Sequence, residues 1–119
     1  MTTQPIPNVT SADVERVVRR EFPADRIGEV LSTLREYGTQ SWQRDPDRVR
    51  LAALKLAAGN VARLRDQIES AKYDYRDVLA AAEYPGYCQR VFWPGLLSPQ
   101  EEQQVIEADW KQYQDWLAR

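Results

Sequence analysis

The sequence contains no histidine, a single cysteine and no long apolar run. Without histidine, the chain lacks the commonest general base and the commonest zinc ligand. Cys88 has no second cysteine with which to form an internal disulfide, and this is consistent with a reducing compartment. No apolar stretch approaches the roughly 20 residues that are needed to span a bilayer. We therefore expect a cytoplasmic protein without a membrane partner.

Other common signals are also missing. The 5 glycines stand at isolated positions, so there is no glycine-rich loop that could hold a phosphate. The N-terminal stretch MTTQPIPNVTS has neither the basic nor the apolar segment of a signal peptide. The net charge of −2 gives no overall field that would draw the chain to DNA or to an anionic membrane. We expect no cofactor.

What the sequence does contain is apolar residues at helical spacing, from Thr10 to the end of the chain. Residues 1–9, with Pro5 and Pro7, are expected to form a loose lead-in. A chain of 119 residues is long enough for one hydrophobic core but not for two. We therefore expect one all-α domain over 10–119, a compact bundle of about five helices.

The centre of this bundle is predicted to be a long helical hairpin. A helix over 46–58 is apolar nearly all round, which is typical of a buried element. Gly59-Asn60 is expected to end the first helix and to cap the next one within a short connection. The next helix, 61–84, is therefore expected to lie antiparallel to the first. Steps of three and four residues continue through 61–84, and this pattern predicts one unbroken helix.

A long, apolar connection follows the hairpin. It runs over 84–97 and contains two Pro-Gly pairs, which predict turns. Loops of this length in a compact domain are either functional or packed by their own side chains. Ser98 and Glu101 then form a capping-box pattern, which predicts the start of a C-terminal helix that packs back across the hairpin.

Aromatic side chains are concentrated in and beside this connection. Tyrosine, tryptophan and arginine are enriched among the residues that dominate binding energy at protein interfaces. The alternative is that the same rings close one end of the core, because a small bundle needs large side chains. Trp42, in a polar loop, is a second candidate, either exposed or folded back over a helix end. The residues predicted to contact a protein partner are Tyr73, Tyr84, Tyr87, Arg90, Phe92 and Trp93.

Carboxylates give an alternative, enzymatic interpretation. Two acidic pairs with three-residue spacing lie on the predicted helix 61–84, and such pairs can hold a magnesium ion. Basic residues nearby can instead neutralise these acids on a solvated face. The alternative function is a magnesium-dependent all-α hydrolase that uses Asp66, Glu69, Asp74 and Asp77.

Arginines in the N-terminal half give a third interpretation, a nucleic-acid-binding regulator. Acidic residues are interspersed among them, and the helix over 46–58 is too apolar to lie in a DNA groove. Nucleic acid is therefore the least favoured partner. The arginines are Arg16, Arg19, Arg20, Arg44, Arg48 and Arg50, and Trp42 lies near them in the sequence.

The missing catalytic residue types and the surplus of aromatic residues together favour a non-catalytic protein-interaction module. Cys88 is expected to be a small, buried, unreactive thiol, because no histidine can activate it. Self-association into a homodimer is the simplest form of the interaction. An accessory or inhibitor partner of another cytoplasmic protein is equally compatible. The interaction surface is expected on the connection 84–97 and on the adjacent face of the helix 61–84.

Overall fold

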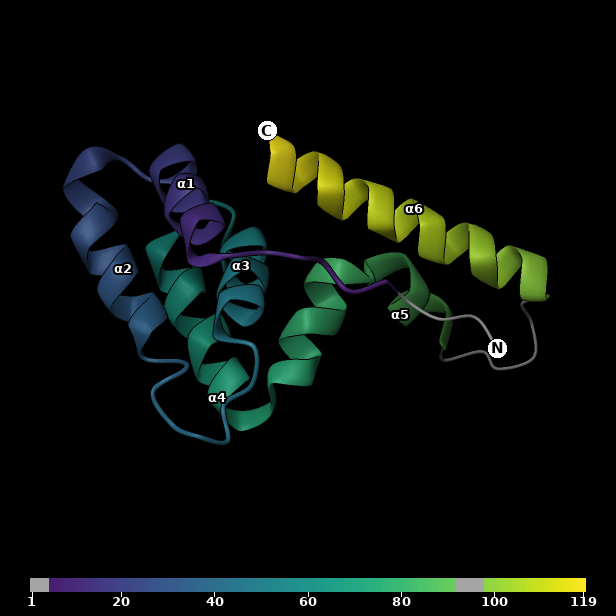
Figure 1. Ribbon diagram of the computed structural model, residues 1–119, viewed down its shortest axis with the longest axis horizontal. Coiled ribbons are helices and arrows are strands. Elements are labelled where there is room, and N and C mark those ends of the chain that lie inside the picture. The colour runs from purple at the N-terminus through teal and green to yellow at the C-terminus, as the bar shows by residue number, and fades with distance from the viewer. Residues whose placement is uncertain (1–4, 92–97) are drawn as a thin grey trace.

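The computed structural model describes residues 5–91 and 98–119, and this part of the chain forms helices and connections without a strand (Figure 1). The all-α, single-domain fold is therefore confirmed. No helix in these two ranges is long and apolar enough to cross a membrane. The elements in chain order are α1 (Ser11–Glu21), η1 (Ala24–Arg26), α2 (Ile27–Arg35), α3 (Pro46–Ala57), α4 (Val61–Glu83), α5 (Pro85–Val91) and α6 (Pro99–Ala118).

The core is built around α3, as its apolar sequence predicts. α1 packs on one side of α3, and α4 makes the most extensive contact with it. Ala58 and Gly59 have left-handed backbones, and the Asn60 side chain caps α4 by accepting a hydrogen bond from the Arg63 amide at 2.9 Å. The residues of α3 that are sealed from water are Val49, Leu51, Ala52, Ala53, Leu54 and Ala57.

The prediction of an unbroken helix over 61–84 is wrong. Asp74 has a non-helical backbone (φ −153°, ψ 101°), and α4 bends there into two halves. Figure 1 shows the first half lying along the core and the second half rising from the bend at a different angle. The second half still contributes Val78, Leu79 and Ala82 to the hydrophobic core, and it leads to α5 and to the contact with α6.

The bend has a local cause, because Asp74 acts as the N-cap of the second half. Its carboxylate accepts a hydrogen bond from the Arg76 amide at 3.1 Å, and its extended backbone is the usual conformation of an N-cap residue. The Arg76 side chain also donates to both carboxylate oxygens, at 3.0 and 3.1 Å. A new helix therefore starts inside a stretch whose apolar spacing is continuous.

The end of α2 is closed by Arg50, which reaches across from α3. Its guanidinium donates to the backbone oxygens of Leu34 at 3.0 Å and Tyr37 at 2.6 Å. These carbonyls lie at the C-terminal end of α2, where a positive charge is favourable. Gly38 follows with a left-handed backbone (φ +101°), as the sequence predicts, and it fits closely against Pro46 and Arg50.

We expect Gly38→Ala to lower the free energy of unfolding by about 2 kcal/mol, because left-handed backbones are strained in residues with a Cβ. The added Cβ would also lie 2.7 Å from the Pro46 Cβ. Gly28→Ala is the matched control: no neighbouring atom lies within 4 Å of its Cβ, and it should raise the free energy of unfolding by about 0.5–1 kcal/mol. Urea denaturation measures both. Equal effects of the two substitutions would contradict this account.

α6 is attached to the rest of the protein along its length. At its C-terminal end, Arg20 of α1 donates to the carbonyls of Leu117 and Arg119, each at 3.1 Å. The same guanidinium lies over the Trp116 ring, and the Trp116 indole donates to Glu21 at 3.1 Å. The other half of α6 packs against α5. α6 thus joins α1 to α5 and to α4.

α5 differs from the sequence-based expectation of a turn at Pro85-Gly86. Pro85 instead opens a short helix, a position that suits proline because its missing amide needs no partner there. Asp109 of α6 is buried and accepts hydrogen bonds from the Gly86 and Tyr87 amides, each at 2.9 Å. This distant carboxylate supplies the cap that the local sequence lacks.

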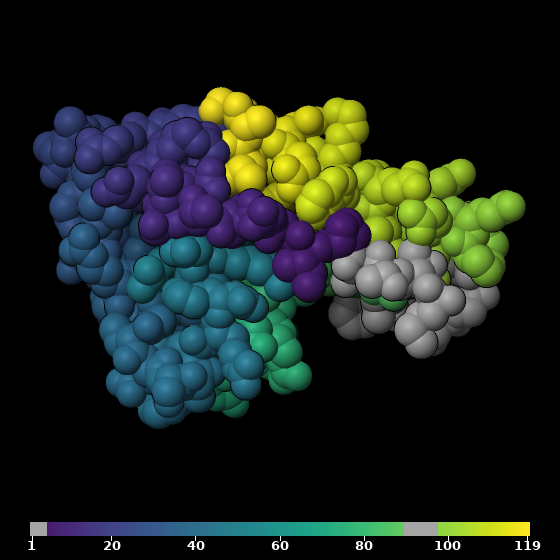
Figure 2. Space-filling model, in the orientation of Figure 1, coloured from purple at the N-terminus to yellow at the C-terminus, as the bar shows by residue number. Residues whose placement is uncertain are grey.

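The described part of the N-terminal lead-in is not loose. Residues 5–9 run as an extended segment along the body of the protein, between α3 and α6 (Figures 1 and 2). Pro7 is buried, Pro5 is half-buried, and Val9 packs against the hydrophobic core. The segment is therefore part of the folded domain.

Candidate interaction surface

Two large aromatic side chains stand exposed at the bend of α4. The exposed fraction is 69% for Trp42 and 94% for Tyr73. Both side chains line one open hollow, whose wall is formed by the bend at Asp74 and by the loop between α2 and α3. Figure 1 shows this loop reaching down beside the bend. We call Trp42, Tyr73 and the hollow that they line the kink surface.

The loop that carries Trp42 is held in place by hydrogen bonds on both sides of it. The Gln43 side-chain oxygen accepts from the amides of Gly38 at 2.7 Å and Gln40 at 3.1 Å. The buried Tyr37 hydroxyl donates to the Arg44 carbonyl at 2.8 Å. Burial is the main reason that the pKa of Tyr37 is raised. Trp42 therefore projects from a fixed backbone, and little further ordering of this loop is needed for binding.

Charged residues surround the kink surface, and they are paired with one another. Hydrogen bonds from the Arg76 side chain and amide lower the pKa of the Asp74 carboxyl. Lys72 donates to Glu69 at 2.8 Å and to Glu36 at 3.1 Å, and these bonds raise its pKa. The rim thus carries both signs of charge around two aromatic rings, which is the usual composition of a protein-binding patch.

Two other predicted contact residues, Tyr84 and Tyr87, lie away from the kink surface. Tyr84 and Tyr87 are half-buried, at the junction of α4 and α5 and in α5 itself. The Tyr87 hydroxyl donates to Glu102 at 3.4 Å. The side chain of Arg90, and Phe92 and Trp93 entirely, lie outside the described part of the chain. Among the predicted residues that the structure describes, Tyr73 lines the kink surface.

Tyr84 belongs to a buried polar cluster with Arg48 and Glu83. The Arg48 guanidinium donates to both Glu83 oxygens, at 2.9 and 2.7 Å, and to the Tyr84 hydroxyl at 2.9 Å. Burial, followed by the charge of Glu83, raises the pKa of Tyr84 to about 12. The hydrogen bond to Glu83 raises the pKa of Arg48, so the guanidinium stays charged. This cluster ties α3 to the end of α4.

The four carboxylates of the hydrolase hypothesis lie along α4 on both sides of the bend. Asp74 is held by Arg76 and Glu69 by Lys72, whereas Asp66 and Asp77 are exposed. Within 5–91 and 98–119, no group of three or more potential metal-ligating side chains comes together. The arrangement of these residues gives the hydrolase interpretation no added support.

The arginines of the nucleic-acid interpretation are divided between surface and interior contacts. Arg20, Arg48 and Arg50 hold α6, Glu83 and the end of α2, as described above. Arg16, Arg19 and Arg44 are exposed. Arg16 also pairs with Asp13 at 3.5 Å, so four of the six arginines have a partner and the remainder is too small to form an extended phosphate-binding face.

Cys88 is half-buried in α5, and its thiol lies 3.7 Å from the Ala80 carbonyl oxygen. Burial raises the pKa of this thiol, and the nearby Asp109 carboxylate adds to the effect. A thiol with a raised pKa is a poor nucleophile at neutral pH. The raised pKa agrees with the expectation of an unreactive thiol, although the side chain is less buried than expected.

Comparisons with protein-family models, with curated proteins and with solved structures find no match for this chain.

Proposed function

We propose that the chain is a non-catalytic protein-interaction module that binds its partner through the kink surface. The observation that carries this proposal is the exposure of Trp42 and Tyr73 on one hollow. A buried aromatic side chain removes roughly 150–250 Å² of surface from water. Both rings forgo this stabilisation in the isolated chain and would gain it on binding. Tryptophan and tyrosine are also the residue types that dominate binding energy at interfaces.

The rigidity of the kink surface supports the proposal further. Trp42 is carried by a loop that is hydrogen-bonded at both ends, and Tyr73 immediately precedes the capped bend at Asp74. A surface that is already ordered loses little conformational entropy on binding. The paired charges of Lys72 and Arg76 would form the polar rim of the interface.

The proposed partner is a protein chain, either another protein or a second copy of this one. A concave surface with two projecting rings suits a partner that inserts a segment between them. We propose a cytoplasmic location, because a chain with one cysteine gains no disulfide from an oxidising compartment. No catalytic role is proposed.

Trp42→Ala and Tyr73→Ala should each weaken association at least tenfold, because each removes one of the two exposed rings. The free energy of unfolding should change by less than about 0.5 kcal/mol, since both side chains are exposed. Capture from extracts of the native host, followed by calorimetry with the purified partner, measures the affinity. Sedimentation equilibrium of the chain alone measures self-association.

Ile6→Ala is the matched control. Ile6 is also an exposed apolar residue, with an exposed fraction of 67%, but it lies on the N-terminal segment away from the kink surface. Its replacement should leave partner affinity and oligomeric mass unchanged. If the Trp42 and Tyr73 variants behave like the Ile6 variant in both measurements, the proposed surface is wrong.

A further inference from the structure

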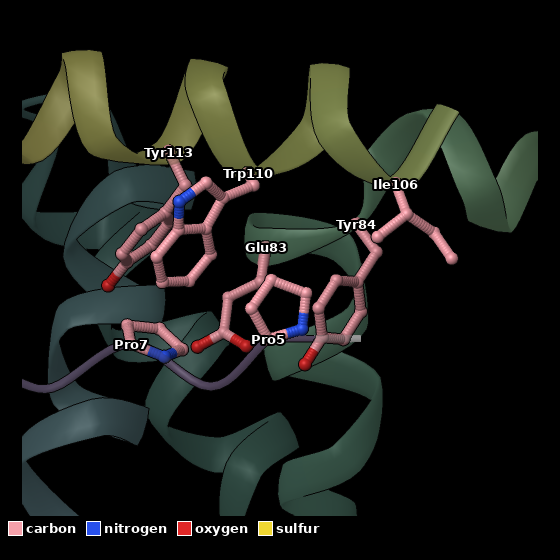
Figure 3. Close-up of a pocket in the computed structure, with 7 residues that line it drawn as sticks. All are labelled: Pro5, Pro7, Glu83, Tyr84, Ile106, Trp110 and Tyr113. Atoms are coloured by element: carbon pink, nitrogen blue, oxygen red, sulfur yellow. The ribbon is translucent and has the colours of Figure 1, made fainter. Parts of the chain in front are cut away.

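The extended N-terminal segment lies against a second aromatic surface, at the junction of α4 and α6. Pro5 and Pro7 line a small cavity together with side chains of these two helices. Figure 3 shows the two proline rings among Tyr84, Trp110 and Tyr113. Pro7 is buried and Pro5 half-buried, whereas Ile6 between them is exposed. The segment thus uses alternate residues, the two prolines, to contact the helices.

The conformation of this segment follows from its sequence. Each proline fixes its own φ near −65°, and the residue before a proline is restricted to extended backbone. A Pro-x-Pro segment is therefore stiff before it binds, and its ordering costs little entropy. Grooves lined by aromatic side chains bind such segments by packing against the proline rings. Tyr84, Trp110 and Tyr113 provide side chains of this kind, and Ile106 adds an apolar contact.

The fit of the chain's own segment leaves one polar group unsatisfied. Tyr113 is buried, and its hydroxyl is without a hydrogen-bond partner in the part of the chain that the structure describes. An unsatisfied buried hydroxyl is unfavourable, and a backbone carbonyl is a suitable acceptor for it. Extended proline-rich segments have free carbonyls, because they form no internal hydrogen bonds. A peptide that presents a carbonyl to Tyr113 would therefore bind better than residues 5–7 do.

We propose that Tyr84, Ile106, Trp110 and Tyr113 form a recognition groove for an extended Pro-x-Pro segment of a partner protein, and that residues 5–7 of the chain occupy this groove as an intramolecular competitor. The groove is separate from the kink surface, since neither Trp42 nor Tyr73 lines it. Tethering gives the competitor an effective concentration of about millimolar. A free peptide of the same sequence should therefore bind the unmodified chain only weakly.

The test uses the full chain with Pro5→Ser and Pro7→Ser, and a peptide of residues 4–9, QPIPNV, as the probe. Because the altered segment is less stiff and lacks both proline rings, it should compete poorly. The peptide should therefore bind the double serine variant at least tenfold more tightly than it binds the unmodified chain. Shifts of the Trp110 indole resonance report binding at the groove, after this signal is identified among the 4 tryptophans with a Trp110→Phe variant.

Two controls make the outcome specific to proline recognition at this groove. The peptide QAIANV should bind at least tenfold more weakly, and Trp110→Ala in the serine background should abolish binding. Trp42→Ala in that background should leave peptide binding unchanged. The groove proposal can therefore be refuted independently of the proposal that the kink surface binds a partner. If the double serine variant does not fold, Pro5→Ser alone serves, since Pro5 is half-buried. Equal binding of both peptides, or equal binding to the serine variant and the unmodified chain, would overturn the proposal.

Discussion

Glu83→Ala is expected to lower the free energy of unfolding by about 3–5 kcal/mol, because it leaves the charge of Arg48 buried without its partner. The Glu83 side chain is 2% exposed and that of Arg48 is 14% exposed. Two hydrogen bonds, at 2.9 and 2.7 Å, join them. Urea denaturation, with a check that the slope of the transition is unchanged, measures the loss.

Two further variants distinguish the cost of leaving Arg48 unpaired from the net contribution of an ion pair to stability. The double variant Arg48→Met with Glu83→Leu should recover most of the loss, because apolar residues of similar volume can replace a buried pair. Asp115→Ala breaks an exposed pair with Lys111 and should cost less than about 1 kcal/mol. A loss below about 1 kcal/mol for Glu83→Ala would show that Arg48 is readily hydrated and that the cluster does not tie α3 to α4.

Asp109→Ala is expected to lower the free energy of unfolding by about 3 kcal/mol and to loosen α5. The buried carboxylate accepts hydrogen bonds from the amides of Gly86 and Tyr87. Each hydrogen bond to a charged group contributes about 1.5–3 kcal/mol. α5 is only 7 residues long, so it depends on this cap and on its contacts with α6. Hydrogen exchange at the Gly86 and Tyr87 amides should accelerate more than exchange in α3.

Glu107→Ala provides the control for the Asp109 variant. Glu107 lies two residues earlier in α6, is exposed, and contacts Gln103 of its own helix. Its replacement should change the free energy of unfolding by less than about 0.5 kcal/mol and leave exchange in α5 unaltered. If the Asp109 variant exchanges at the same rate as the unmodified chain at Gly86 and Tyr87, α5 is held by apolar contacts alone.

Most of the helices could be predicted from the sequence because their ends carry local signals. Thr10 begins α1, and Pro46 stands in the first turn of α3. Ser98 caps α6, accepting a hydrogen bond from the Glu101 amide at 3.2 Å. Gly38 takes the left-handed backbone that glycine favours. Where caps and apolar spacing agree, the structure follows the prediction.

The bend in α4 was missed because two signals in the sequence disagree there. The apolar spacing continues through Asp74, and this spacing predicts one helix. Asp74 followed three residues later by Asp77 resembles the start of a helix, and this was the available signal. The hydrogen bond from the Arg76 amide to Asp74 shows which interaction the backbone adopts. Periodicity alone does not report a change of helix axis.

α5 and its cap could not be predicted, because the decisive contact is distant in the sequence. Asp109 is more than 20 residues away in the sequence from the amides that donate hydrogen bonds to it. It is also buried on a helix whose outer face is expected to be polar. Likewise, Arg48 and Arg50 look like surface charges in the sequence. Their partners, Glu83 and the carbonyls at the end of α2, come from other helices.

The candidate site could be predicted only in part. Residue type makes both Tyr73 and Trp42 candidates, but nothing in the sequence links them, because their proximity depends on the bend of α4. Tyr84 was selected for the same reason, yet it packs beside Arg48 and the N-terminal prolines. Residue type identifies candidates for an interface, whereas exposure follows from the fold.

Site-specific photo-crosslinking in the native host tests the central claim, binding of a protein at the kink surface, most directly. Tyr73 and, separately, the exposed Gln104 of α6 are replaced by p-benzoylphenylalanine, and the chain is irradiated and analysed by mass. The account predicts one dominant covalent adduct with a protein from position 73 and none from position 104, with the adduct lost when Trp42→Ala is added. No adduct from position 73, or the same adducts from both positions, would contradict it.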